Sequence, residues 1–171
     1  MTAERSHQTA AWFAAHPRLK AGVVAANRWL PLIPFACYPA LLIWLGLKLA
    51  AGQTQLLPAA VRAVLVPAAV FLGGTALRRA LNFPRPYQQP GFVPLVQKER
   101  QGCSFPSRHA LSAGVIAAVW LYFSPAAGAA LTVVALVICG LRVLTGVHFV
   151  RDVAAGFTLG FALGLAGMWL L

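Results

Sequence analysis

The chain has 171 residues, 60% of them hydrophobic and 10% charged, and its mean hydropathy is +0.74. A water-soluble domain of this length has no interior large enough to bury so much apolar material, so the composition indicates an integral membrane protein. Lysine and arginine number 14 against 3 acidic residues, for a formal net charge of +11. Because these cations lie at the edges of apolar runs, they indicate contact with lipid headgroups or phosphate rather than with nucleic acid.

The N-terminal segment, residues 1–29, is predicted to be an amphipathic helix that lies in the membrane interface. Apolar residues recur at helical spacing from Trp12 to Leu30. Pro17 and Arg18 interrupt this pattern and would be costly inside lipid. A surface helix therefore fits this segment better than a membrane span does.

Five apolar runs follow, most of them long enough to cross the hydrocarbon core of a bilayer. They cover Leu30–Ala50, Leu57–Leu77, His109–Phe123, Ala126–Thr145 and Val153–Leu171. In the last run, Gly156, Gly160 and Gly164 share one stripe, where another helix can approach closely. The sequence predicts an all-α, multi-pass transmembrane helical bundle of about five spans in a single domain, 1–171.

One long polar loop is predicted at 78–108, between the second and third apolar runs. It is rich in proline and glutamine and carries six of the basic residues. Counting the crossings places this loop on the same membrane face as Leu141–Asp152, which joins the fourth run to the fifth. We therefore expect the two segments to meet there and form the active site.

Arginines converge on this face. The helix beginning near Pro106–His109 offers free backbone N–H groups and the positive end of a helix dipole, both of which favour an anion. Arg78, Arg85 and Arg142 stand at the edges of neighbouring runs. Arginine is suited to bidentate binding of phosphate oxygens, so a phosphate is the expected occupant.

Two histidines and one acid suggest chemistry beyond binding. Asp152 follows His148 by four residues, which is one helical turn, in a chain with only three acids. A carboxylate bonded to one imidazole nitrogen fixes the tautomer and leaves the other nitrogen basic. His148 is therefore a candidate nucleophile toward phosphorus, and His109 a candidate acid for the departing oxygen.

These residues form three ordered motifs. They read Arg78-x6-Arg85-Pro86, then Pro106-Ser107-Arg108-His109, then Arg142-x5-His148-x3-Asp152. Together they resemble the signature of the type 2 phosphatidic acid phosphatase (PAP2) family, a signature that the vanadium haloperoxidases share.

The resemblance implies a metal-independent membrane lipid phosphatase with a phosphohistidine intermediate and no cofactor. It implies His148 as nucleophile, Asp152 as its orienting group and His109 as general acid. Around the phosphate it places Arg78, Arg85, Ser107 and Arg142, and we add Arg108.

Three positions depart from the usual family pattern. Arg78 replaces a lysine, which keeps the charge and changes its geometry. Arg108 replaces a glycine, so it either adds a phosphate contact or narrows the site. Leu141 replaces a serine and removes a hydroxyl donor. Neither histidine nor the aspartate is affected.

Several functional alternatives stay open on the sequence. A lipid phosphotransferase would pass the phosphoryl group to an alcohol instead of water, and a non-catalytic protein would only bind or transport phosphate lipids. Phosphatidylglycerophosphate, phosphatidate and isoprenyl diphosphates such as undecaprenyl diphosphate are all candidate substrates. The expected location is the cell membrane, while the membrane side of the site and the oligomeric state are left open.

Overall fold

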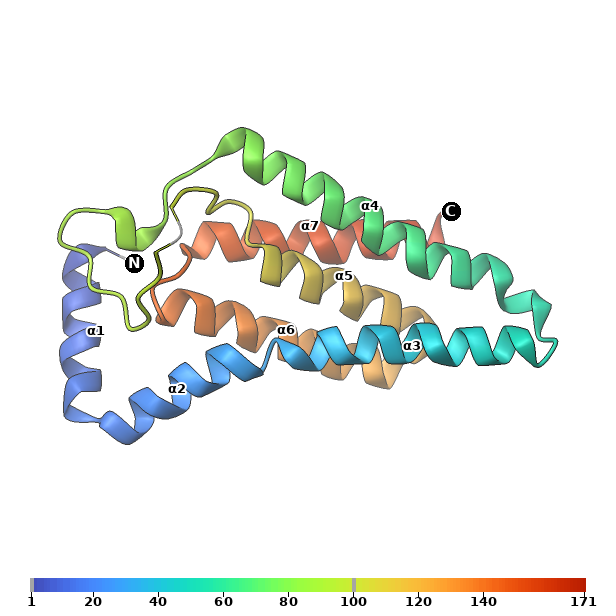
Figure 1. Ribbon diagram of the computed structural model, residues 1–171, viewed down its shortest axis with the longest axis horizontal. Helices are drawn as coiled ribbons and strands as arrows, with labels where there is room; N and C mark the ends of the chain where they lie inside the picture. Colours follow the sequence, from blue (N-terminus) through green and yellow to red (C-terminus); the bar gives the residue numbers. More distant parts are fainter. Residues whose placement is uncertain (1, 100) are drawn as a thin grey trace.

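The computed structural model describes residues 2–99 and 101–171, and this part of the chain is helical with no strand (Figure 1). The predicted all-α fold is therefore confirmed. The α-helices are α1 Ala3–Ala15, α2 Pro17–Trp29, α3 Leu32–Ala50, α4 Leu57–Leu81, α5 Arg108–Phe123, α6 Pro125–Leu144 and α7 Val150–Trp169. Two short 3₁₀ turns, η1 Thr54–Leu56 and η2 Pro86–Gln88, precede α4 and interrupt the long loop.

Four segments are long and apolar enough to cross a membrane. They are Pro17–Ala50, which joins α2 to α3, then Thr54–Gln88, Pro125–Leu144 and Val150–Trp169. The fifth apolar helix, α5, has 16 residues and is shorter than these. It lies at the centre of the bundle, with every residue from Ala110 to Val119 buried. The expectation of about five spans thus corresponds to four long helices around or beside a short central one.

The glycine stripe of α7 faces α5, which is the close approach of another helix that the sequence predicted. A Cβ atom added at Gly156 would come within 2.6 Å of the Ser107 carbonyl oxygen, and one at Gly164 within 2.7 Å of the Ala118 Cβ. At Gly160 the added atom would overlap the Leu111 backbone. Helices α5 and α7 accordingly share the most extensive contact in the molecule, which holds their N-terminal ends together.

The N-terminal segment forms two helices where one was predicted. Helix α1 ends at Ala15 and α2 begins at Pro17, with His16 between them in a non-helical conformation. Proline lacks the N–H that a continuous helix would need and is favoured at the first helical position, so it starts the second helix. Helix α1 runs across the loop end of the bundle (Figure 1). The interfacial placement of residues 1–29 stays a prediction.

The long loop is shorter than predicted because α4 continues to Leu81. Arg78 therefore belongs to the last helical turn, where a cation interacts favourably with the helix dipole. Asn82 ends the helix in the left-handed conformation, with φ of 41°. Its Oδ1 accepts a hydrogen bond from Cys103 N at 3.0 Å, which ties the start of the loop to its end.

A second crosslink stabilises the loop around η2. The side-chain oxygen of Gln88 accepts hydrogen bonds from Arg85 N at 2.8 Å and from Gly102 N at 3.0 Å. Helix α1 also holds the loop, since Val93 N donates to Ser6 Oγ at 3.0 Å and the His7 ring bonds the Gly91 carbonyl at 2.8 Å. The loop is thus fixed from both sides, although its composition is polar and rich in proline.

Candidate active site

A small cavity lies where α4 and α6 end and α5 and α7 begin. Its volume is about 90 Å³, which corresponds to roughly three water molecules at about 30 Å³ each. It has room for a small polyatomic ion. The residues that line it are Arg78, Arg85, Lys98, Arg108, His109, Arg142, Val147 and His148.

The four arginines predicted to hold phosphate all line this cavity, and three of them are almost fully buried. Arg78 is 3% exposed, Arg85 5% and Arg142 4%. Arg78 Nη1 donates to the Pro106 carbonyl at 3.0 Å, and Arg85 Nε donates to the Gly102 carbonyl at 3.1 Å. Burying several like charges together is costly, so the arrangement is suited to a multiply charged anion that neutralises them.

His148 and Asp152 form a buried pair beside the arginines. His148 Nδ1 lies 3.4 Å from Asp152 Oδ2, and the two side chains are 3% and 0% exposed. The same carboxylate oxygen accepts hydrogen bonds from Phe149 N, at 3.1 Å, and from the Ser104 hydroxyl. The pair assigns the proton to Nδ1 and leaves Nε2 as the basic nitrogen.

The turn before His148 sets the direction of its side chain. Helix α6 ends at Leu144, and Gly146 follows with φ of 75°. A side chain at Gly146 would also meet Phe92 and Pro94 of the loop. His148 N then donates to the Arg142 carbonyl at 3.1 Å, which fixes the histidine next to the end of α6. Glycine is needed here both for the backbone conformation and for the close approach of the loop.

The pKa of His148 is lowered from 6.5 to about 4. Burial is the largest cause, because it disfavours the charged imidazolium. The positive charges of Arg85 and Arg78 act in the same direction, while the hydrogen bond and the charge of Asp152 act in the opposite direction. The ring is therefore neutral near pH 7, which is the form that can act as a nucleophile.

His109 reaches the cavity from a different helix. It is the second residue of α5, and its ring lies edge-on to Phe35 of α3, with ring centroids 6.3 Å apart. It also lines a neighbouring cavity together with Arg108. The two predicted histidines thus share one small cavity while being carried by separate segments.

Two predicted site residues, Ser107 and Asp152, do not line the cavity themselves. Asp152 lies behind His148, and Ser107 lies at the start of α5. The Ser107 side chain is fully buried, and its Oγ has no hydrogen-bond partner among the described residues. Its backbone N–H donates to the Asp152 carbonyl at 2.8 Å. The serine therefore fastens the start of α5 to the first turn of α7, and its contact with phosphate stays a prediction.

Comparisons with known proteins identify the family. The model of the PAP2 superfamily matches residues 59–171. The chain belongs to this superfamily. This result confirms the resemblance drawn from the three motifs, all of which lie within the matched residues.

Two solved structures are similar to this PAP2 protein. LpxE from Aquifex aeolicus has a TM-score of 0.67 at 24% identity, with 89% of this chain and 86% of that chain covered. The first transmembrane PAP2 type phosphatidylglycerolphosphate phosphatase from Bacillus subtilis has a TM-score of 0.54 at 25% identity, with 95% and 90% covered. No curated protein sequence matches the chain. The solved structures support the fold of an integral membrane PAP2 protein.

Sequence reasoning missed two residues of the PAP2 site. Ser104 bonds Asp152 and lies 3.4 Å from His148 Nδ1, but no periodicity marks it in the loop. Lys98 lines the cavity, and burial followed by the charges of Arg142 and Arg85 lowers the pKa of its amine. Its positive charge in the loop was visible in the sequence, but nothing distinguished it from the other basic loop residues.

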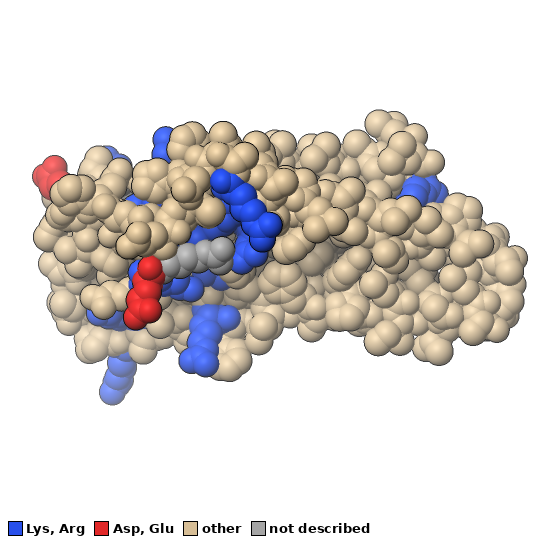
Figure 2. Space-filling model, turned by 45° about the horizontal axis from the view of Figure 1, so that its top comes forward, with Lys and Arg blue, Asp and Glu red and all other residues tan. Residues whose placement is uncertain are grey.

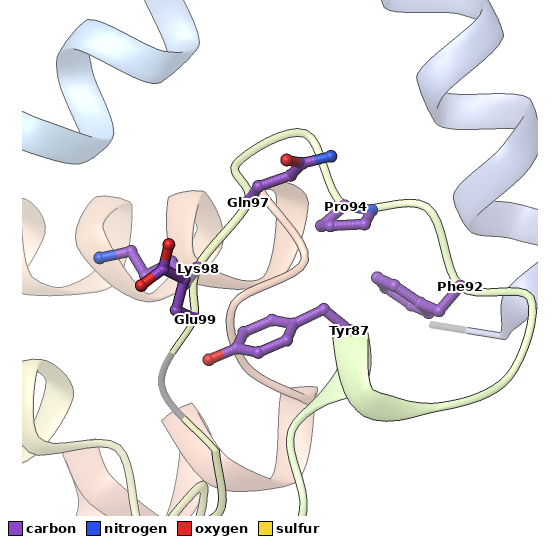
Figure 3. Close-up of a pocket in the computed structure, with 6 residues that line it drawn as sticks. All are labelled: Tyr87, Phe92, Pro94, Gln97, Lys98 and Glu99. Carbon is purple, nitrogen blue, oxygen red and sulfur yellow. The ribbon is translucent and has the colours of Figure 1, made fainter.

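A second, outer cavity of about 700 Å³ shares Lys98 with the first, and Figure 3 shows the side chains that line it. Its lining comes from the loop and is mostly polar or aromatic: Tyr87, Phe92, Pro94, Gln97, Lys98 and Glu99. The Lys98 side chain extends away from Phe92 and Pro94 (Figure 3). Basic side chains gather over this loop end of the molecule, while the helical body is largely uncharged (Figure 2).

Proposed function

We propose that the protein is an integral-membrane lipid phosphatase that hydrolyses a lipid phosphate or diphosphate through a phosphohistidine intermediate. The observation that carries the proposal is the buried His148–Asp152 pair, whose histidine lines a cavity otherwise lined mainly by cations. Binding alone needs no oriented imidazole, whereas nucleophilic attack on phosphorus does. The Bacillus subtilis neighbour, described as a phosphatidylglycerolphosphate phosphatase, supports a lipid phosphate as substrate.

In this mechanism the arginines position the phosphate and His148 attacks it. Arg78, Arg85 and Arg142 bind the non-bridging oxygens and stabilise the negative charge of the transition state. Asp152 accepts the Nδ1 proton of His148 in a hydrogen bond and so directs Nε2 toward phosphorus. His109 protonates the departing oxygen, and after departure it accepts a proton from the water that cleaves the P–N bond.

Phosphate release by purified protein tests the proposal. Wild-type protein should release inorganic phosphate from at least one member of a panel containing phosphatidate, phosphatidylglycerophosphate and an isoprenyl diphosphate. His148→Ala should lower turnover by on the order of 10⁴-fold or more. It should also remove the acid-labile label expected for phosphohistidine. Full turnover by this variant would refute the nucleophile, and transfer to an added alcohol without phosphate release would assign a phosphotransferase.

His109→Ala tests the general acid separately. The alkoxide that leaves phosphatidate needs a proton to depart, so the variant should lose about 10²- to 10⁴-fold on this substrate. p-Nitrophenol departs readily as an anion, so p-nitrophenyl phosphate should partly rescue the variant. Equal losses on both substrates would contradict this role.

A further inference from the structure

A series of cavities leads from the phosphate site into the helical layer. The phosphate cavity shares Arg108 and His109 with a cavity of about 220 Å³ that is also lined by Phe35, Phe71 and Ser112. Phe35, Phe71 and Ser112 also line an apolar cavity of about 290 Å³ between α3, α4 and α5. The lining is therefore continuous from His109 to an apolar surface between α3, α4 and α5.

The two cavities that continue from the phosphate cavity, one lined by Phe35, Phe71 and Ser112 and the apolar one beyond it, form a single groove. The position of His109 indicates which part of a substrate this groove binds. In an in-line displacement, the departing oxygen lies opposite the attacking nitrogen, and the general acid must reach that oxygen. His109 lines the groove, whereas it does not line the outer polar cavity. The leaving group therefore lies on the groove side, and the aromatic rings of Phe35 and Phe71 provide it with apolar surface.

Arg108 stands at the junction of the two spaces. Of the five cations around the phosphate cavity, it is the one that also lines the groove. It is half-buried, and its guanidinium has no hydrogen bond or ion pair with any described residue. A cation placed between other arginines and an apolar groove is stabilised by an anion of its own.

We propose that the groove binds the hydrophobic chain of the leaving group and that Arg108 binds a second phosphate group between this chain and the scissile phosphorus. The inference rests on the proposed phosphatase function and narrows its substrate to lipids whose leaving group is itself anionic. A lipid diphosphate has its second phosphate directly at this position. In a lipid whose terminal phosphate is linked through glycerol to a phosphodiester, that phosphodiester is the second anion and lies a few bonds farther from the scissile phosphorus.

The reaction with a diphosphate balances as follows. Nε2 of His148 forms a bond to the terminal phosphorus, and the bond from that phosphorus to the bridging oxygen breaks. The electron pair stays on the bridging oxygen, which receives a proton from His109 and departs as a lipid monophosphate held by Arg108. Water then attacks the phosphorus, the P–N bond breaks, inorganic phosphate leaves, and His109 regains a proton.

Matched substrates test the role of Arg108. Farnesyl phosphate and farnesyl diphosphate carry the same chain and differ in the second phosphate. Arg108→Gln should lower kcat/KM for the diphosphate at least about tenfold more than for the monophosphate, because the contact with the second phosphate is lost in one case only. Arg108→Lys should restore part of the difference, since it restores the charge.

A second substrate pair identifies the source of the anion. Phosphatidylglycerophosphate and phosphatidate with equal acyl chains differ in a phosphodiester on the leaving side. The measured quantity is the ratio of the two kcat/KM values within each pair. If Arg108→Gln changes this ratio only for the phosphatidyl pair, the second anion is a phosphodiester. If it changes the ratio only for the farnesyl pair, the second anion is a diphosphate. Unchanged ratios in both pairs would overturn the inference for Arg108.

Two adjacent residues of α4 test the groove. Ala68 lines the apolar cavity between α3, α4 and α5, and Ala69 lines a separate cavity between α4 and α7 that shares no residue with the phosphate site. Ala68→Trp should lower kcat/KM for a long-chain lipid phosphate about tenfold and leave p-nitrophenyl phosphate unchanged, because only the chain needs the groove. Ala69→Trp is the matched control and should change neither.

The outcomes separate this inference from the function on which it rests. Equal losses for Ala68→Trp and Ala69→Trp, or equal losses on the lipid and on p-nitrophenyl phosphate, would overturn the groove assignment. If the wild-type protein released no phosphate from any substrate, the proposed function itself would fail. Wild-type activity with unaltered ratios in the variants would refute only the placement of the leaving group.

Discussion

The two ends of the helix bundle both carry buried or half-buried arginine, but the protein surrounds it differently. At the end away from the loop, Arg62 donates to the Met168 carbonyl at 2.8 Å and lies 5.4 Å from the centre of the Tyr122 ring. At the loop end, Arg142 is 4% exposed, and its Nε has no hydrogen-bond partner among the described residues. A cation that the protein itself satisfies stabilises the fold, whereas one buried among other cations is prepared for an anionic ligand.

Replacing the arginine at each end of the bundle should have its most different effect on catalytic activity. Arg142→Gln should lower kcat/KM for a lipid phosphate by about 10²-fold or more, because it removes a cation from the developing charge of the transition state. Arg62→Gln should change it less than about twofold, since its contacts are remote from phosphorus. Steady-state assays of both variants measure the contrast. Comparable losses at the two ends would remove the distinction drawn here.

The pH dependence of kcat/KM sharpens the comparison. The pKa of His148 is lowered to about 4, so the free protein keeps its neutral nucleophile until the pH falls through that value. Below it, activity should fall about tenfold per pH unit as the ring becomes protonated. Arg85 lowers this pKa, so Arg85→Gln should move the acid limb to higher pH. Arg62→Gln serves as the control, and an acid limb that moved equally in both variants would contradict the electrostatic account.

Thermal stability should respond in the opposite direction at the two ends. Arg142→Gln relieves repulsion among buried cations, so Tm should rise by about 2 to 4 °C for each kcal/mol relieved. Arg62→Gln removes a hydrogen bond to a helix-end carbonyl and should lower Tm slightly. Unfolding in detergent monitored by intrinsic fluorescence measures both. A lower Tm for Arg142→Gln would show that the fold needs this arginine for its own stability.

The smallest expected effect is that of chelation. The chain has three acidic residues, and the one beside the cavity, Asp152, already accepts hydrogen bonds from Ser104 and Phe149 N. Carboxylate clusters are the usual ligands of magnesium and calcium. EDTA should therefore leave phosphate release unchanged, while vanadate, which adopts the five-coordinate shape of the transition state, should inhibit it. Activity lost with EDTA and restored by magnesium would contradict the metal-independent mechanism.

The sequence predicted the helical bundle and the convergence of the arginines for different reasons. Hydropathy marks the apolar runs directly, because the bilayer imposes their length. The places of Arg78, Arg85 and Arg142 followed from motif spacing and from counting crossings. The N-terminal break at Pro17 had a visible signal as well, but helical periodicity on both sides of it suggested one continuous helix.

The loop was harder to predict because distant residues determine its shape. Gln88 fixes the loop by bonding backbone groups at Arg85 and Gly102, and Ser6 of α1 holds Val93. None of these pairs follows from periodicity. Lys98 and Ser104 reach the site only as a result of this folding, so sequence reasoning missed them. It found Arg85 in the same loop because Arg85 belongs to a motif.

The glycine contacts between α7 and α5 have a mechanical consequence. His109 belongs to one of these helices and Asp152 to the other, and Ser107 N joins their first turns. The distance between His109, the proposed acid, and Asp152, which orients the proposed nucleophile, is therefore a property of a rigid pair of helices rather than of the surrounding lipid. On reconstitution into bilayers of different acyl length, kcat should stay nearly constant. KM should vary instead, because α3 and α4 pack less extensively and border the groove proposed to receive the lipid chain.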